Sequence, residues 1–292
     1  MKLLVGIVTF NRCATLLNSI KEHVNSHIDE SNILVVDNNS DDGTQEQLKL
    51  QFPKIRLVQN PENIGSAGGF AVAMQYALEH QYDYIWLYND DSHPKSGAKE
   101  LMATALQDLE SKSEKIGMLK MGMLRNGKSE ASYWRGKRIT KWVEKSNIPI
   151  KTDLITFDGC IINVGVIRQI GTCDARFFMG VYEFDFCLRA LDAGYEIYTL
   201  PAGLIEDPKM GSAKGVPAWR MYYVTRNQLY FALKRKSFSA VSSFALLEAK
   251  KIASIVFTQD NKRLRLRMKI KALIDGATGR MGKRVIPSSA KK

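Results

Sequence analysis

Continuous apolar runs alternate with stretches of helical spacing over the first 90 residues of the chain. Residues 2–10 (KLLVGIVTF), 33–36 and 84–88 are unbroken apolar runs, typical of strands buried on both faces of a sheet. Residues 13–28 carry apolar side chains at helical spacing, and a second helix is predicted over 68–80. This alternation predicts an α/β fold whose parallel strands are joined by right-handed crossovers.

Polar clusters follow the predicted strands, at residues 9–12, 37–43, 60–69 and 89–93. The carboxyl ends of parallel strands meet at one edge of a sheet, and ligands of such folds bind there. We therefore expect these four stretches, which are far apart in the chain, to form a single site.

The second half of the chain is less regular. Residues 126–150 are polar, with aromatic side chains among basic ones, and are predicted to form a mobile loop or a short hairpin. Apolar runs at 154–157 and 160–167 predict two strands. Helical spacing predicts helices over 183–194, 217–236, 238–257 and 261–275.

The composition is that of an ordinary globular protein: 292 residues, of which 45% are hydrophobic and 25% charged. It excludes disordered, collagen-like and coiled-coil proteins. No apolar run approaches the roughly 18 residues of a membrane-spanning helix, and the first residues do not resemble a signal peptide. Four widely spaced cysteines without a CxxC pair are typical of free thiols in a reducing compartment. We therefore expect a cytoplasmic protein.

The formal net charge of +12 is unevenly distributed. From residue 209 onward, 20 Lys and Arg residues accompany only three acidic ones, whereas the first 208 residues have a net charge of −5. This asymmetry indicates a polyanionic partner, either an anionic membrane surface or nucleic acid, although a solvated helical face explains part of it. As a helix, 261–275 would be strongly cationic, with Leu264, Met268 and Leu273 roughly on one side, which suits a membrane surface.

The triplet Asn89, Asp90 and Asp91 at the end of a predicted strand is the most specific chemical feature. Clustered carboxylate oxygens suit Mg²⁺ or Mn²⁺, which often bridge to the phosphates of a substrate. A turn without a ligand is the alternative, because Asn and Asp both favour turns. The glycine-rich stretch 65–69 lets the backbone approach a phosphate closely. Its spacing matches neither the Walker sequence nor GxGxxG, which disfavours a dinucleotide-binding fold.

Six sequence blocks occur in order over residues 3–231: GIVTFNR, VVDNNSDDGT, NPENIGSAGGF, WLYNDDSHP, FFMGVYEFDFCLRALDAGY and YYVTRNQLYF. Together they resemble the family-2 glycosyltransferases of the GT-A fold, in particular the galactofuranosyl- and rhamnosyltransferase branch that builds bacterial surface polysaccharides. The resemblance implies a mostly parallel central sheet flanked by helices. It also implies a nucleotide-sugar-binding and catalytic domain over 1–210, and a helical, basic region over 211–292 on the acceptor and membrane side.

The resemblance further implies a role for each matching residue. Glu183 stands at the position of the general base, with Asp185 as a second acid nearby; an exposed acid that opens a helix is the alternative for Glu183. Asp91 is the expected ligand of Mn²⁺ or Mg²⁺, and Glu206 and Asp207 lie where the family has a metal-binding His. The residues expected to bind the nucleotide sugar are Thr9, Arg12, Asp37, Asn63, Gly65, Gly68, Gly69, Asn89, Asp90 and Arg226.

Three further assignments leave alternatives open. Trp134 and Trp219 are candidates for stacking on an acceptor sugar, with ordinary packing as the alternative. Arg226 either faces the donor phosphates or pairs with a carboxylate. The chain also departs from the family pattern, because Asn89 replaces the first Asp of the triplet and Tyr182 replaces one of two acids before FCLRA.

The implied reaction is an inverting glycosyl transfer, in which an acceptor hydroxyl attacks the anomeric carbon while the nucleoside diphosphate leaves. The expected partners are a nucleotide-sugar donor, first of all UDP-galactofuranose, and a lipid-linked bacterial surface glycan as acceptor. Basic residues would hold the enzyme peripherally at the inner face of the membrane. The alternatives are a dTDP-rhamnosyltransferase of the same fold and a catalytically weak module that binds a nucleotide sugar. A nucleic-acid partner is not expected, since the aromatic blocks of RNA-binding modules are missing, and the last two blocks have no place in a nucleotidyltransferase.

Overall fold

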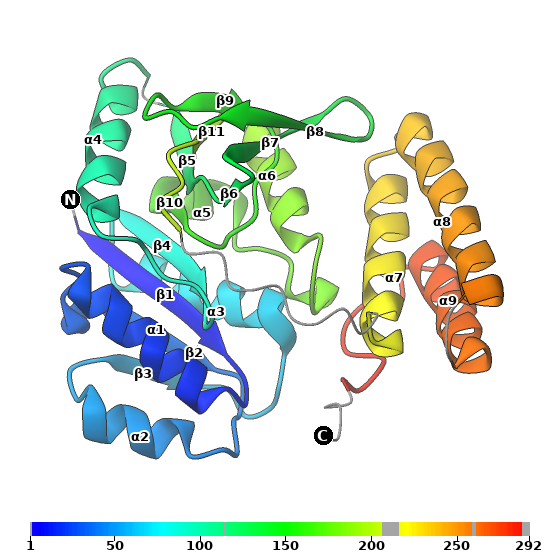
Figure 1. Cartoon of the computed structure of the whole chain (residues 1–292), viewed down its shortest axis with the longest axis horizontal. Helices are drawn as coiled ribbons and strands as arrows, with labels where there is room; N and C mark the ends of the chain where they lie inside the picture. Colours follow the sequence, from blue (N-terminus) through cyan, green and yellow to red (C-terminus); the bar gives the residue numbers. More distant parts are fainter. Residues whose placement is uncertain (1, 114, 206–215, 259–260, 288–292) are drawn as a thin grey trace.

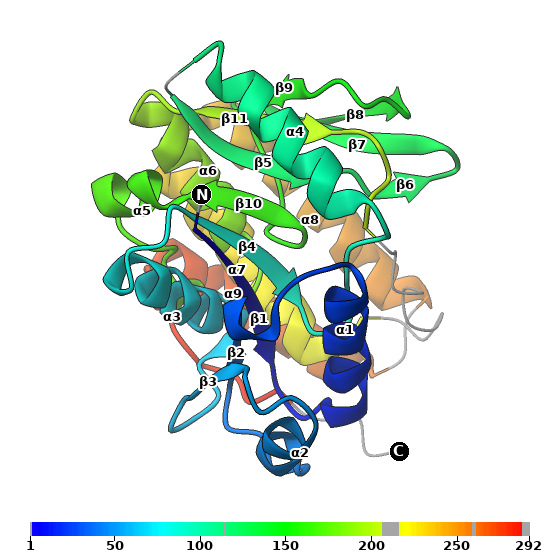
Figure 2. The same cartoon turned by 90° about the vertical axis from the view of Figure 1, so that its left-hand side faces the viewer.

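The computed structural model describes residues 2–113, 115–205, 216–258 and 261–287. Within these residues the central sheet contains β1 (Leu3–Thr9), β2 (Ile33–Asp37), β3 (Arg56–Gln59), β4 (Tyr84–Asn89), β5 (Ile116–Met121), β9 (Ile150–Thr152), β10 (Cys160–Asn163) and β11 (Glu196–Leu200). Their order is β3-β2-β1-β4-β10-β5-β11-β9 (Figures 1 and 2). Four strand pairs are parallel, while β10 runs antiparallel to both neighbours and β9 antiparallel to β11. The expected mostly parallel α/β sheet is confirmed.

Helices cover both faces of this sheet, which explains the unbroken apolar runs. Leu4 and Val8 of β1 point into one apolar cluster, and Val5 and Ile7 point into a second cluster on the opposite face. The first cluster includes side chains of α3 (Gly65–Glu79), α5 (Val164–Ile170) and α6 (Tyr182–Asp192). The second includes side chains of α1 (Cys13–Asn25), α2 (Thr44–Gln51) and α4 (Ala98–Glu110).

Two predicted strands of the second half are wrong in their extent. The run 160–167 is split into β10 and α5, because Asn163 accepts a hydrogen bond from the Gly165 N–H at 2.8 Å and thereby caps the helix. The run 154–157 is not a strand; Leu154 forms an isolated bridge with Ser132, and the strand of this region lies earlier, at β9.

A separate small sheet is formed by β6 (Leu124–Arg125), β7 (Lys128–Trp134) and β8 (Arg138–Glu144), in that order. All its pairs are antiparallel. Of the two alternatives for 126–150, the hairpin is therefore correct. Its turn contacts the C-terminal helices, since the Ser237 hydroxyl donates to the Gly136 carbonyl at 2.6 Å.

Three helices follow the sheet: α7 (Ala218–Lys234), α8 (Phe238–Thr258) and α9 (Lys262–Ala277). Figure 1 shows them at one end of the molecule, with α8 and α9 outermost. The predicted helices over 217–236, 238–257 and 261–275 are thus confirmed, whereas the predicted boundary between residues 210 and 211 lies outside the described residues. In the part of the chain that the structure describes, no helix has the length and apolarity required to cross a bilayer.

Helix α9 buries charge and exposes apolar side chains. Arg265, Lys269 and Asp275 are buried, and the Lys269 ammonium donates to the Thr225 hydroxyl at 2.6 Å and to the Glu248 carboxylate. The outer side carries exposed Leu264, Ile270 and Ile274. The predicted apolar side made of Leu264, Met268 and Leu273 is therefore wrong: Met268 and Leu273 are half-buried, whereas Leu264 faces solvent.

Candidate active site

The carboxyl ends of β1, β2 and β4 lie side by side and bring the polar clusters together. In the ladder, Thr9 pairs with Asp37 of β2, and Val8 pairs with Asn89 of β4. Asn60 joins the same edge, because its backbone N–H donates to the Asp37 carbonyl at 2.9 Å. The predicted convergence of the four stretches is confirmed.

One arginine binds both aspartates of the triplet. Arg12 Nη1 lies 2.7 Å from Asp90 Oδ1 and 2.9 Å from Asp91 Oδ2, and the Thr9 hydroxyl donates to Asp90 at 2.8 Å. Burial raises the pKa of Asp90 to about 6, although Arg12 and Thr9 lower it. The Asp91 side chain keeps 29% of its surface exposed, so Asp91 is the carboxylate that a ligand reaches.

Asp37 is fully buried and organises the loop that follows β2. Its carboxylate accepts hydrogen bonds from the backbone N–H and hydroxyl of Ser40 and, at 3.0 Å, from the Gln45 side-chain amide. The adjacent Asn38 amide donates to the Gly65 carbonyl at 3.2 Å. Asp37, which was expected to hold the nucleoside, thus fixes the conformation of the loop that follows β2.

The glycine-rich stretch is the start of α3, and its glycines allow close packing. Gly65 has φ +75°, and a Cβ there would lie 2.1 Å from the Phe178 carbonyl oxygen. A Cβ on Gly69 would lie 2.4 Å from the Val8 side chain of β1. Asn63 accepts from the Gly65 N–H at 2.8 Å and starts the helix, whereas a Cβ on Gly68 would meet only the side chain of the preceding turn. These glycines hold α3 against the sheet and against the loop that leads to α6.

Asp158, which the sequence analysis did not select, connects the two halves of the site. Its carboxylate accepts from the Asn89 N–H at 3.1 Å and from the Ser92 hydroxyl, and the half-buried Lys120 ammonium donates to its carbonyl oxygen. The charge of Asp158 acts on both Asp90 and Glu183. The signal in the sequence was an Asp-Gly pair directly before an apolar run, which resembles an ordinary turn.

Glu183 opens α6 in a charged and poorly solvated environment. Loss of solvation raises its pKa to about 7, and the Asp158 charge adds to this effect. The cations Lys120 and Arg138 act in the opposite direction. A carboxyl group tuned to neutral pH in this way is typical of a general base.

Asp185, the second predicted acid, has a different environment from the one expected. Its side chain is 2% exposed, and its two oxygens lie 2.6 Å from Lys234 Nζ and 3.1 Å from Arg189 Nε. Because both oxygens are bound by cations of α6 and α7, Asp185 fastens these helices together. Its prediction as a catalytic acid is corrected to a structural ion pair.

Arg226 takes neither of the two roles left open for it. It is fully buried beside the rings of Tyr222 and Tyr223, and it donates to the carbonyls of Phe177 at 2.8 Å and of Gly282 at 2.6 Å. The next residue, Asn227, donates to the carbonyls of residues 177, 179 and 180. The YYVTRN block therefore holds the loop that leads into Glu183.

The two tryptophans lie in different places. Trp134 of β7 packs against Phe231 with ring centroids 5.3 Å apart and lines a cavity beside α6. Trp219 of α7 packs against a cluster that contains Phe178 and Tyr222, and its buried indole N–H has no hydrogen-bond partner among the described residues. Trp134 thus stays a candidate for stacking on an acceptor sugar, whereas Trp219 packs against other side chains of the protein. Glu206 and Asp207 lie outside the described residues.

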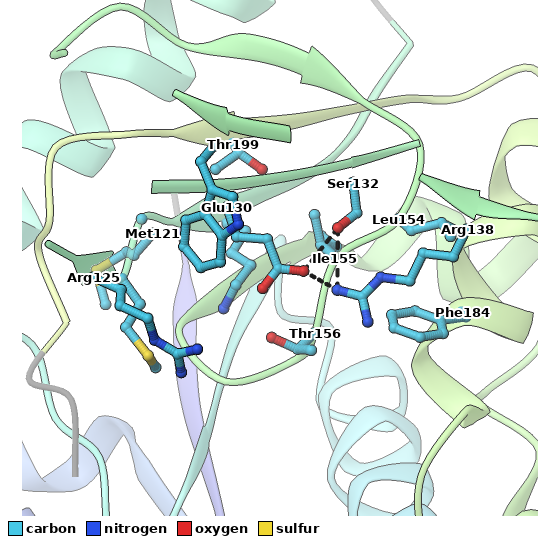
Figure 3. A pocket seen from close by; sticks show the side chains of 14 residues that line it. Met121, Arg125, Glu130, Ser132, Arg138, Leu154, Ile155, Thr156, Phe184 and Thr199 are labelled. Atoms are coloured by element: carbon cyan, nitrogen blue, oxygen red, sulfur yellow. Dashed lines mark hydrogen bonds and ion pairs between the residues drawn. The ribbon is translucent and has the colours of Figure 1, made fainter. Parts of the chain in front are cut away.

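A charged pocket lies between the small sheet and α6 (Figure 3). Lys120, Arg125, Glu130 and Arg138 line it, together with Phe184, the residue after Glu183. Figure 3 shows Arg138 turned toward Glu130 and Ser132; it forms an ion pair with Glu130 and lies 4.8 Å from the centre of the Phe184 ring. The sequence analysis noted basic and aromatic residues here without assigning them to the site.

The donor groups at the sheet edge are compatible with a hard divalent cation. Asp91 offers an accessible carboxylate, and oxygen ligands are those that Mg²⁺ and Mn²⁺ prefer. Among the described residues there is no cluster of three or more His, Cys, Asp or Glu side chains with metal-binding geometry. Mg²⁺ usually keeps several waters and takes further ligands from substrate phosphates.

The profile of glycosyl transferase family 2 matches residues 4–159, slightly more than half of the chain. The galactofuranosyltransferase GlfT1 of Mycolicibacterium smegmatis is 25% identical over 201 residues, which span 64% of this chain and 65% of that protein, just under two thirds of its length. The dTDP-rhamnosyl transferase RfbF of Shigella flexneri is 24% identical over 305 residues, which span 94% of this chain and 95% of that protein.

Two solved structures share the fold. The mannosyltransferase PcManGT from Pyrobaculum calidifontis, in complex with GDP-Man and Mn²⁺, has a TM-score of 0.58 at 15% identity, covering 95% of this chain and 86% of that one. The TarS fragment 1–349 from S. aureus, in complex with UDP-GlcNAc, has a TM-score of 0.60 at 14% identity, covering 94% of this chain and 80% of that one. At such identities the likeness shows a common GT-A fold.

Proposed function

Since this chain belongs to glycosyl transferase family 2, we propose that it transfers a sugar, with inversion, from a nucleoside diphosphate to an acceptor hydroxyl. The observation that carries the proposal is the position of Asp158: its carboxylate accepts hydrogen bonds from Asn89 and Ser92 beside the aspartates, and its charge also acts on Glu183 at the start of α6. A donor whose diphosphate lies at the aspartates would therefore extend its sugar toward Glu183.

Glu183 is the proposed general base. With a pKa of about 7, its carboxyl group is substantially ionised at neutral pH and still basic enough to take the proton from the attacking hydroxyl. General-base catalysis of this kind contributes about 10²–10⁴-fold to a rate. Lys120 and Arg138 favour the ionised form and so keep the base available.

A divalent cation, Mn²⁺ or Mg²⁺, is part of the proposal, with Asp91 as its protein ligand. When bound, such a cation neutralises charge on the leaving diphosphate. Arg12, whose side chain is 45% exposed, adds a fixed positive charge beside the same carboxylates. Asp158, half-buried and hydrogen-bonded to Ser92 and Asn89, holds the loop that carries them.

UDP-galactofuranose is the proposed donor and dTDP-rhamnose the alternative. GlfT1 supports the first, and RfbF, which aligns over nearly the whole chain, supports the second. The proposed acceptor is a hydroxyl of a lipid-linked bacterial surface glycan. We further propose that the basic helices work at the anionic inner face of the membrane, where exposed Arg263 and Arg267 share the outer side of α9 with Ile270 and Ile274.

The proposal is tested by incubating the protein with each donor, Mn²⁺ and a glycan acceptor, and measuring the released nucleoside diphosphate. We expect turnover with one donor, abolished in Glu183→Gln and retained in the control Glu79→Gln, an exposed glutamate at the end of α3. Thermal stabilisation by a donor without any turnover would instead indicate a module that only binds nucleotide sugars.

A further inference from the structure

An apolar groove of about 480 Å³ lies next to the charged pocket. It is bounded by the small sheet, the start of α6, and the facing sides of α7 and α8. The apolar part of its wall includes Trp134, Val181, Phe231, Phe244 and Leu247. Beside the groove, the hairpin turn is fastened to the loop between α7 and α8, because the Ser237 hydroxyl donates to the Gly136 carbonyl.

The groove and the charged pocket are neighbours that share part of their walls. Arg138, Leu154 and Phe184 belong to the walls of both. Arg138, which lines both, also lies near enough to Glu183 for the two charges to interact. A ligand that reached from the base into the groove would therefore pass Arg138.

Charged side chains are concentrated at the inner end of this path. Lys120, Arg125 and Glu130 line the inner pocket, although most of its exposed wall is apolar. Arg138 and Lys137 follow where pocket and groove meet. Beyond them, Gln228 and Ser243 are the uncharged polar side chains among the described residues of the groove wall, so a polypeptide would find few partners for its backbone.

The outer end of the groove opens at an apolar surface. Leu246 and Leu247 of α8 line it while remaining 61% and 54% exposed. Figure 1 shows α8 at the same end of the molecule as α9, whose outer side carries exposed isoleucines and arginines. An apolar chain leaving the groove would therefore emerge at the surface that we propose to face the membrane.

From the two cations at the inner end of an apolar groove whose outer end carries exposed leucines, we propose that the groove binds the hydrocarbon chain of a lipid-phosphate acceptor. The phosphate lies at Arg138 and Lys137, and the sugar hydroxyl lies toward Glu183. This inference rests on the proposed function for the identity of the reaction, but the lipid site itself is testable without turnover.

The direct test is calorimetric titration of the protein with dodecyl phosphate below its critical micelle concentration, with butyl phosphate as the short-chain comparison. We expect dodecyl phosphate to bind at least tenfold more tightly. Ala240→Trp fills the groove and should abolish this preference, whereas Ala245→Trp, the same change at an exposed position of α8 outside the groove, should leave it intact. Leu247→Gln, at an exposed position that cannot disturb the core, should weaken dodecyl phosphate several-fold.

The second test uses two acceptors that carry the same sugar phosphate on a long or a short chain. Ala240→Trp should raise KM for the long-chain acceptor at least tenfold and leave kcat/KM for the short one within twofold. Equal loss with both acceptors, or equal affinity of the wild type for both alkyl phosphates, would overturn the lipid site. Dimerisation of the wild type that Ala240→Trp abolishes would assign the groove to a second copy instead. If the wild type turns over no donor yet binds dodecyl phosphate as described, the proposed function fails and the lipid site stands.

Discussion

Glu183 and Asp185 lie two residues apart on α6 and meet opposite environments. Glu183 has lost solvent without gaining a direct ion pair to any residue that the structure describes, and its pKa rises to about 7 mainly through the loss of solvent. Asp185 is as deeply buried as the core, but Lys234 and Arg189 bind both its oxygens. A pattern of acids along the chain does not distinguish these cases, because the cations come from another turn and another helix.

At this scale we expect kcat/KM to rise as the pH passes through about 7, because the base acts in its ionised form. The Lys120 charge lowers the pKa of Glu183, so Lys120→Met should move the inflection to higher pH. The measurement is a pH profile of nucleoside diphosphate release between pH 5.5 and 9, a range chosen to bracket the inflection. Lys115→Met, in which an exposed lysine is removed, is the matched control. If Lys120→Met leaves the inflection at the same pH, the profile does not report the ionisation of Glu183.

At the scale of elements, α9 departs most from what its pattern predicted. Its alternation of basic and apolar residues indicated an apolar side, yet it packs through Lys269, because Glu248 of α8 and Thr225 of α7 supply the partners. Despite burial, hydrogen bonds from Lys251 and Lys269 lower the pKa of Glu248. The helix is thus held by a buried charge network as well as by apolar contacts.

We expect Lys269→Met to lower the free energy of unfolding by about 3 kcal/mol, because it leaves Glu248 buried with one partner fewer. The double variant Lys269→Met/Glu248→Leu should recover most of this loss, since the uncompensated charge is gone. Urea denaturation measures both, with Lys262→Met at an exposed position of the same helix as the control. If Lys269→Met is as stable as the wild type, the network does not hold α9.

Strands β1, β2 and β4 were predictable from sequence because unbroken apolar runs ended in clusters of turn residues. Their register at Thr9, Asp37 and Asn89 followed from parallel pairing, which fixed the edge where the site forms. The split of 160–167 was not predictable from apolar character, because strand and helix are both buried there; the cap at Asn163 was the available signal.

The candidate site was only partly predictable for a different reason. Arg12, Asp90 and Asp91 were selected correctly as neighbours at the sheet edge. Arg226 was not interpretable from sequence, because its partners are main-chain carbonyls about 50 residues away in either direction. Asp158 carries no pattern of its own, and its position between the two halves of the site follows from tertiary structure alone.

At the scale of the whole molecule, acidic and basic residues lie in different parts of the fold. The sheet carries the acidic residues of the candidate site, while α8 and α9 at the opposite end carry exposed apolar and basic side chains (Figure 1). Leu264, Ile270 and Ile274 are each about half exposed. An amphipathic surface of this kind suits the boundary between headgroups and acyl chains of an anionic leaflet.

We expect Arg263→Glu/Arg267→Glu to weaken binding to phosphatidylglycerol-containing vesicles about tenfold or more, since each basic residue near such a surface contributes about 1 kcal/mol. Sedimentation with vesicles at low and high salt measures the loss, which salt should diminish. Lys21→Glu/Lys49→Glu places the same charge change on α1 and α2 and is the matched control. Equal weakening in both variants would mean that net charge, not this surface, governs binding.

Removing residues 259–292 is a less specific test of membrane binding, because the carbonyls of Gly282 and Val285 accept hydrogen bonds from Arg226 and Tyr223.

The hydrogen bonds that hold the loop before Glu183 have a consequence for the order in which the chain folds during its synthesis. Residues 177–180 are held by Arg226 and Asn227, and Arg226 is itself held by the carbonyl of Gly282. The sheet strands, by contrast, are complete once β11 has left the ribosome. A nascent chain would therefore form its sheet early and order the loop before Glu183 only after about eighty more residues have been translated.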